Sequence, residues 1–203
     1  MFDRAFNALA QRPLHRVAQR LHARGVRADA VTVAGFAVGL LALPLIATGH
    51  PLWALAAMAA NRLGDGLDGA LARLGTPTDR GAFLDIVCDF VFYASIPLGF
   101  ALADPVANAL PAAVLLFAFM GTASSFLAFA VLAARRGLAS TAFPQKGFYY
   151  LGGLTESTET MATFALMCVW PGWFGPLAYG FAVMCGITTA TRWVWGARVL
   201  GQK

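Results

Sequence analysis

The sequence has little charge for its length. Only 12% of its 203 residues are charged, whereas 59% are hydrophobic, and the mean hydropathy is +0.65. In ordinary soluble domains roughly a quarter of the residues are charged, so this composition excludes that class and is typical of a protein that spans a bilayer. At roughly 20 residues for each span, the length suits a bundle of about six membrane helices.

Cysteine is also scarce. The three cysteines, Cys88, Cys168 and Cys185, all lie in apolar runs, and their spacing fits neither a disulfide framework nor a metal site. We expect them to be buried thiols. The N-terminus lacks the short apolar core and small-residue cleavage site of a signal peptide, so we expect none. Repeats and low-complexity segments are absent too, which predicts one domain at 29–203 after a basic segment at 1–28.

The basic segment at 1–28 alternates arginines with apolar residues at roughly helical spacing. This pattern predicts an amphipathic helix lying in the anionic membrane surface, and the alternative is a solvated basic tail. The residues that form the pattern are Arg4, Arg12, Arg16, Arg20, Arg24 and Arg27, with Phe2, Phe6, Leu9, Val17 and Leu21 between them.

The rest of the chain predicts an all-α, polytopic fold with six transmembrane helices. The predicted spans are 30–48, 52–73, 81–103, 109–134, 151–170 and 175–194. The connections after the first, third and fifth spans contain no Lys or Arg, and the basic residues gather at the other side. The positive-inside rule therefore predicts cytoplasmic termini and a cytoplasmic active site. The same one-sided distribution explains the net charge of +5 without nucleic acid as a partner.

Carboxylates gather where the second predicted span ends and the third begins. Asp65 and Asp68 are three residues apart on one helical face, and Asp85 and Asp89 share a stripe with Gly81. A turn-like GTPT lies between the two groups, so antiparallel helices would bring the four carboxylates together. Close carboxylates repel one another unless a cation lies between them.

Such an all-oxygen site suits Mg²⁺ or Mn²⁺. Two ions about 3.5–4 Å apart are a recurring device for displacement at phosphorus. Ion pairing with arginine is the structural alternative, but arginines are too few on these faces to neutralise four carboxylates. A proton- or ion-coupled transporter is the alternative from another class. It would spread acidic residues across the membrane depth rather than gather them at one side.

This run resembles the signature of the CDP-alcohol phosphatidyltransferases, D-x-x-D-G-x-x-A-R followed by a spacer and G-x-x-x-D-x-x-x-D. The matching residues are Asp65, Asp68, Gly69, Ala72, Arg73, Gly81, Asp85 and Asp89. The resemblance implies a phospholipid-synthesising enzyme of the bacterial inner membrane. Such an enzyme transfers a phosphatidyl group from a CDP-linked donor, usually CDP-diacylglycerol, to a small alcohol and releases CMP. It also implies a homodimer, for which Gly35 and Gly39 or Ser124 and Ser125 would permit close helix packing.

The resemblance implies roles for the signature residues. Asp65, Asp68 and Asp85 would be the principal metal ligands. Asp89 would be the general base, lying also near the second of two Mg²⁺ or Mn²⁺ ions.

Four further residues would bind the donor. Gly69 and Ala72 lack bulk where the nucleotide approaches, and Arg73 would reach the pyrophosphate unless it is a snorkelling arginine. Thr78 matches a nucleotide-contacting position, or it merely forms the turn.

Two more residues resemble the entry to the family's first span. Asp29 and Thr32, in RADAVTVAG, would contact the substrate. For Asp29 the alternative is a helix cap.

For the acceptor pocket the sequence leaves several alternatives. Family members that use a phosphorylated alcohol are expected to have arginines near the fifth span, where this sequence has Glu156 and Glu159. These glutamates either suit a cationic or hydroxyl-rich acceptor or favour a helix N-terminus. Arg135, Arg136 and Lys146 remain candidates for binding a phosphate. The same signature also serves the reverse arrangement, in which a soluble CDP-alcohol reacts with a lipid hydroxyl.

Overall fold

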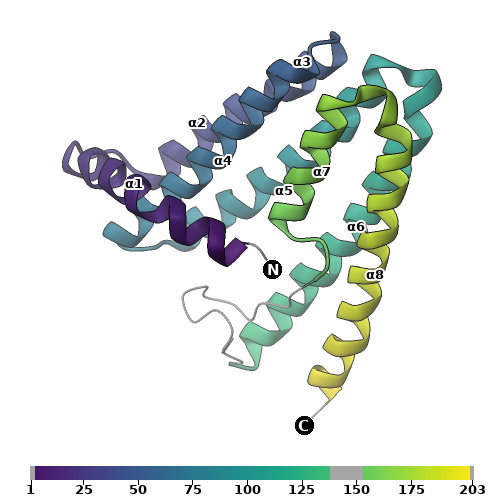
Figure 1. Ribbon diagram of the computed structural model, residues 1–203. Helices are drawn as coiled ribbons and strands as arrows, with labels where there is room; N and C mark the ends of the chain where they lie inside the picture. The colour runs from purple at the N-terminus through teal and green to yellow at the C-terminus, as the bar shows by residue number, and fades with distance from the viewer. Residues whose placement is uncertain (1–2, 138–152, 202–203) are drawn as a thin grey trace.

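The computed structural model describes residues 3–137 and 153–201, with side chains from residue 13 onward. The regular elements of this part of the chain are all helices, with no strand, which confirms the all-α prediction (Figure 1). The elements are α1 (Asp3–Ala23), α2 (Ala28–Leu40), α3 (Ala42–Ala47), α4 (Pro51–Leu74), α5 (Asp79–Ala103), α6 (Pro105–Arg135), α7 (Ser157–Val169), the 3-10 helix η1 (Pro171–Trp173) and α8 (Phe174–Gly201).

Four helical stretches of the described residues are long and apolar enough to cross a membrane. They are Ala28–Ala47, Asp79–Ala103, Pro105–Arg135 and Pro171–Gly201. The other two predicted spans correspond to α4 and α7. Residues 62–74 of α4 carry four charged residues, and α7 has only 13 residues, fewer than the roughly 20 that a span needs.

Three predicted boundaries are wrong. The predicted sixth span at 175–194 ends too early, because α8 continues to Gly201. The predicted fourth span at 109–134 begins late, because Pro105 opens α6 and the Asp104 side chain accepts a hydrogen bond from the Ala107 N–H at 3.1 Å. The predicted fifth span begins too early, because residues 153–156 are not helical and α7 begins at Ser157. There the Thr188 hydroxyl accepts hydrogen bonds at 3.2 Å from the N–H groups of Leu154 and Thr155.

The first predicted span is interrupted at Leu41, between α2 and α3. Pro44 lacks the N–H that would bond to the carbonyl of residue 40. At the same place, the Leu41 N–H bonds to the Val38 carbonyl, three residues earlier, at 3.1 Å, which is the pattern of a 3-10 turn. This local tightening explains why one apolar run yields two helices.

The helices form a bundle with its turns at two ends. The turns after α3, α5 and α7 lie together at the top of Figure 1, and α6 and α8, which lie side by side, both end at the bottom. The core is apolar and includes the stacked rings of Phe100 and Phe174, whose centroids are 4.5 Å apart. Large apolar side chains also cover the outside, among them Val106, Phe117 and Val183. Such an exposed apolar surface is that of a protein embedded in lipid.

The helix α1 lies across α4. Its residue Ala18 is fully buried in a small cluster with Ala70 and Leu71 of α4. The apolar side of this basic helix therefore covers part of the bundle.

Candidate active site

The site lies where α2 and α4 approach each other closely. A Cβ atom added to Gly64 would lie 3.1 Å from the Gly35 Cα, and one added to Gly39 would lie 2.8 Å from the Asn61 side chain. Glycine at these positions lets the two backbones meet. The sequence offered Gly35 and Gly39 as dimer contacts, but in the structure they face α4 of their own chain. Ser124 and Ser125 donate hydrogen bonds to carbonyls of their own helix.

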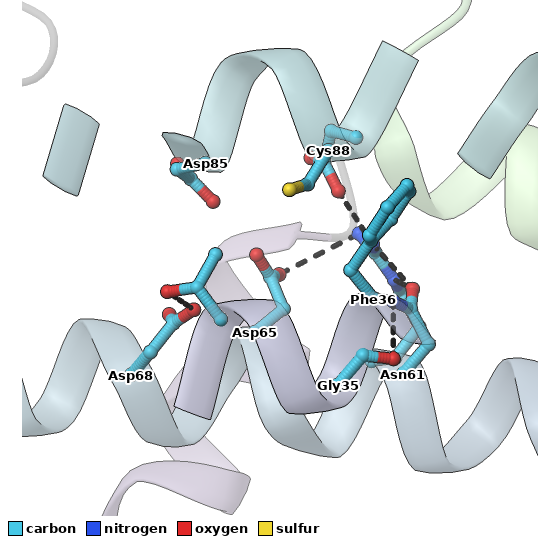
Figure 2. Close-up of a pocket in the computed structure, with 10 residues that line it drawn as sticks. Gly35, Phe36, Asn61, Asp65, Asp68, Asp85 and Cys88 are labelled. Atoms are coloured by element: carbon cyan, nitrogen blue, oxygen red, sulfur yellow. Dashed lines mark hydrogen bonds and ion pairs between the residues drawn. The ribbon is translucent and has the colours of Figure 1, made fainter. Parts of the chain in front are cut away.

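Three carboxylates converge beside this contact. Oxygens of Asp65 and Asp68 on α4 and of Asp85 on α5 all lie within 4.8 Å of one another, and Figure 2 shows Asp85 across the pocket from the other two. Asp68 is buried, with 7% of its surface exposed. The pocket is lined by Thr32, Gly35, Phe36, Asn61, Arg62, Asp65, Asp68, Asp85, Cys88 and Asp89.

This group of three fits a divalent cation. Its donors are hard carboxylate oxygens on separate helices, which is the ligand type that Mg²⁺ and Mn²⁺ prefer. The group concentrates negative charge in a partly buried place, where a cation would relieve the repulsion. The type of ligand atom and the geometry of the group therefore both suit a divalent cation.

Thr32 supports one of the three carboxylates. Its hydroxyl donates to Asp68 Oδ2 at 2.5 Å and also lies 3.2 Å from the Ala28 carbonyl. A hydroxyl that touches a candidate ligand from a neighbouring helix fixes the orientation of that ligand.

Asp89 lies in the pocket but has a different neighbour. Its Oδ1 accepts a hydrogen bond from Arg62 Nη2 at 2.5 Å, while Arg62 Nη1 is 3.5 Å from Asp65 Oδ2. Arg62 and Asn61 are not among the site residues predicted from the sequence, and the structure places both in the pocket. Two signals pointed to Arg62: its position three residues before Asp65, and the high cost of an arginine inside a membrane helix.

The start of α5 is fixed by the residues of the connection. Thr78 is the N-cap, and its hydroxyl accepts a hydrogen bond from the Gly81 N–H at 3.1 Å. A Cβ atom on Gly81 would lie 3.2 Å from that hydroxyl and 3.4 Å from Asp29 Oδ1. Asp29 is not the N-cap of α2, which is Arg27. Its carboxylate instead lies 3.2 Å from Arg27 and 3.5 Å from Arg80.

The remaining donor-side residues lie on the last turns of α4. Arg73 is exposed, and a Cβ atom on Gly69 would lie 3.4 Å from its Nη1. Ala72 is half-buried. A methyl group at residue 69 would therefore be in ordinary van der Waals contact with the Arg73 guanidinium.

The candidate acceptor residues are not brought together into one described pocket. Arg135 and Arg136 lie at the end of α6 and are exposed, and Lys146 lies outside the described residues. At the start of α7, Glu159 accepts a hydrogen bond from the Glu156 N–H at 3.2 Å, and Glu156 accepts one from the Gly153 N–H at 3.4 Å. Both glutamates therefore stabilise the beginning of that helix.

Comparison with known proteins identifies relatives over most of the chain. The family model for CDP-alcohol phosphatidyltransferase matches residues 26–195. The inner membrane protein YnjF of Escherichia coli (strain K12) is 51% identical over 195 residues, which are 96% of this chain and 94% of that protein. The archaetidylinositol phosphate synthase of Pyrococcus horikoshii is 35% identical over 97 residues, 47% of this chain and 52% of that one.

The fold is also found among solved structures. The crystal structure of Mycobacterium tuberculosis phosphatidylinositol phosphate synthase (PgsA1) with CDP-DAG bound matches with a TM-score of 0.66. The match covers 91% of this chain and 93% of that chain at 24% identity.

Proposed function

Because the chain belongs to the CDP-alcohol phosphatidyltransferase family, we propose that it transfers a phosphatidyl group from a CDP-linked lipid to an alcohol and releases CMP. CDP-diacylglycerol is the proposed donor, and phospholipid synthesis is the proposed role. The observation that carries this proposal is the convergence of Asp65, Asp68 and Asp85 within 4.8 Å. That is the arrangement a metal-dependent displacement at phosphorus requires.

The names of the relatives support the donor but leave the acceptor open. PgsA1 has CDP-DAG bound in its crystal structure, and the archaeal relative is by name a synthase of archaetidylinositol phosphate. The E. coli relative is described only as an inner membrane protein. The reverse arrangement, a soluble CDP-alcohol with a lipid hydroxyl as acceptor, would use the same carboxylates.

Asp65, Asp68 and Asp85 would hold Mg²⁺ or Mn²⁺, and Asp89 would join them as a ligand if two ions bind. When bound, the ions supply positive charge that offsets the pyrophosphate and the charge developing on the leaving CMP. Thr32 keeps Asp68 oriented. Asp89 takes the proton from the acceptor hydroxyl, whose oxygen bonds to the lipid-bearing phosphorus as the bond from that phosphorus to CMP breaks.

Donor binding is assigned to residues that border the carboxylates. Gly69 and Ala72 admit the nucleotide, and Arg73 binds the pyrophosphate. Thr78, the N-cap of α5, and Asp29, in the first turn of α2, complete the nucleotide side. In this assignment Asp29 acts together with its arginine neighbours, because ion pairs fix its carboxylate in the structure.

The proposed topology has six spans, with α4 and α7 crossing the membrane beside the four stretches that qualify by length and composition. Both termini and the carboxylates lie on the cytoplasmic side, since the basic residues gather there. Residues 1–28 form an interfacial segment, and residues 29–203 form the catalytic domain. We also propose a homodimer within the bacterial inner membrane.

The test is an assay of the purified protein with radiolabelled CDP-diacylglycerol and a panel of alcohols, following CMP release and the lipid product. Mg²⁺ or Mn²⁺ should be required. The panel should include inositol phosphate, glycerol phosphate, free polyols and amino alcohols, because Glu156 and Glu159 suit a different acceptor from Arg135 and Arg136. A matched panel of CDP-alcohols with diacylglycerol tests the reverse arrangement. Full activity in excess EDTA would refute the metal-dependent mechanism.

A further inference from the structure

Arg62 points into the acidic pocket from α4. Its Nη2 donates to Asp89 Oδ1 at 2.5 Å, and its side chain is only 19% exposed. Charged side chains are costly to place within a membrane helix, and those found there usually have a function. The residue thus needs an explanation beyond packing.

The guanidinium is held in one orientation by neighbours on α4 and α5, one of which is itself bonded to α2. Its Nε and Nη2 both donate to Asn61 Oδ1, at 3.0 and 2.7 Å, and Asn61 Nδ2 in turn donates to the Gly35 carbonyl of α2 at 3.1 Å. The guanidinium carbon lies 5.3 Å from the centre of the Phe92 ring on α5. These contacts use the planar, forked shape of arginine, which a lysine lacks.

The network continues to the start of α7. Arg62 Nη1 donates to the Tyr93 hydroxyl at 3.1 Å, and that hydroxyl lies 2.9 Å from Ser157 Oγ. Ser157 is the first residue of α7. A continuous chain of hydrogen bonds therefore joins Asp89 to the helix near which the acceptor is expected.

We propose that Arg62 is a positioning residue for the transfer reaction. It holds the Asp89 carboxylate in the orientation in which Asp89 takes the acceptor's proton, and through Tyr93 and Ser157 it keeps the start of α7 aligned with that carboxylate. The proposal rests on the proposed function, in which Asp89 is the base. It gives Arg62 a role separate from that of Asp65, Asp68 and Asp85.

The first test compares turnover with binding of Mn²⁺ alone, measured by electron paramagnetic resonance on the purified protein. Arg62→Gln should lower turnover about 10- to 100-fold, as loss of an orienting contact does. The same change should tighten Mn²⁺ binding by roughly 3- to 10-fold, because it removes a positive charge beside the carboxylates. Arg62→Lys keeps the charge but loses the fork, so turnover should fall while Mn²⁺ binding stays near that of the wild type.

A fall in turnover together with tighter Mn²⁺ binding distinguishes a positioning role from a purely structural one, because a collapsed pocket would lower both turnover and metal affinity. Weaker or unchanged Mn²⁺ binding in Arg62→Gln would overturn the proposal. If the wild-type protein transfers nothing, the proposed function fails along with the reaction role of Arg62. The Mn²⁺ titration then still shows whether the guanidinium acts on the carboxylates.

The second test is a double-mutant cycle of Arg62→Gln with Asp89→Asn. If Arg62 acts through Asp89, its change should cost little turnover once Asp89 is already changed, so the two effects should not add. The control cycle replaces Arg62→Gln with Arg192→Lys. Arg192 is also buried and donates to the Thr122 carbonyl of α6 at 3.0 Å, and it does not line the pocket of Asp89. Additive effects in the Arg62 cycle would refute the positioning role.

Discussion

Thr32→Val should weaken metal binding without unfolding the protein. Valine has nearly the shape of threonine but lacks the hydroxyl that donates to Asp68 Oδ2 at 2.5 Å. A hydrogen bond to a charged group contributes about 1.5–3 kcal/mol, which corresponds to roughly 10- to 100-fold in affinity. Loss of an outer-shell partner of a metal ligand costs about the same factor. Both arguments therefore predict a fall of about one to two orders of magnitude.

The assay is a titration of Mn²⁺ alone, followed by the Mg²⁺ dependence of CMP release. Thr32→Ser keeps the hydroxyl and should bind metal much as the wild type does. Thr163→Val is the matched control. The Thr163 hydroxyl donates to the Glu159 carbonyl one turn earlier at 2.9 Å, as Thr32 does to Ala28, yet it contacts no carboxylate in the described structure. Metal affinity in Thr32→Val equal to that of both controls would refute the idea that Thr32 orients a ligand.

Three further predictions follow from the packing, the topology and the carboxylates. Gly39→Ala should destabilise the protein by about 1–3 kcal/mol in detergent unfolding, because its Cβ would lie 2.8 Å from the Asn61 side chain. Gly180→Ala, with nothing within 4 Å of the added Cβ, should be neutral or stabilising. A cysteine introduced beside His50 in a cysteine-free protein should be labelled from outside the cell, and labelling only after permeabilisation would reverse the topology. Asp89→Asn should bind the donor with metal but turn over about 10²–10⁴-fold more slowly, whereas Asp68→Asn should lose metal and donor binding. Recovery of Asp89→Asn at high Mg²⁺ would make Asp89 a ligand only.

The sequence predicts the helices well because their signal is local. Apolar runs and flanking turn residues mark α4 and α5 within two residues of their observed bounds. The start of α7 was missed because Thr188, more than thirty residues along the chain, holds the preceding backbone in place. A contact of that kind leaves no mark in the local pattern.

The site was predictable only in part, for a similar reason. Residue spacing brings Asp65 and Asp68 onto one face, and the turn before α5 lets Asp85 face them. Spacing does not show that α2 packs against both α4 and α5, which is why Thr32 could be assigned only by family resemblance. Nor does it show the glycine contact that brings α2 so close.

The division of the four aspartates is the main result that the spacing conceals. In the sequence they look equivalent, but the structure gives Asp89 an arginine at 2.5 Å and leaves Asp65, Asp68 and Asp85 grouped within 4.8 Å. Arg62 lies 3.5 Å from Asp65, which is farther than its distance to Asp89, so its positive charge acts mainly on Asp89. The repulsion within the group of three calls for a cation, whereas Asp89 already has one beside it. The electrostatics of the pocket therefore favour a ligand role for the three, and the arginine beside Asp89 sets that carboxylate apart from them.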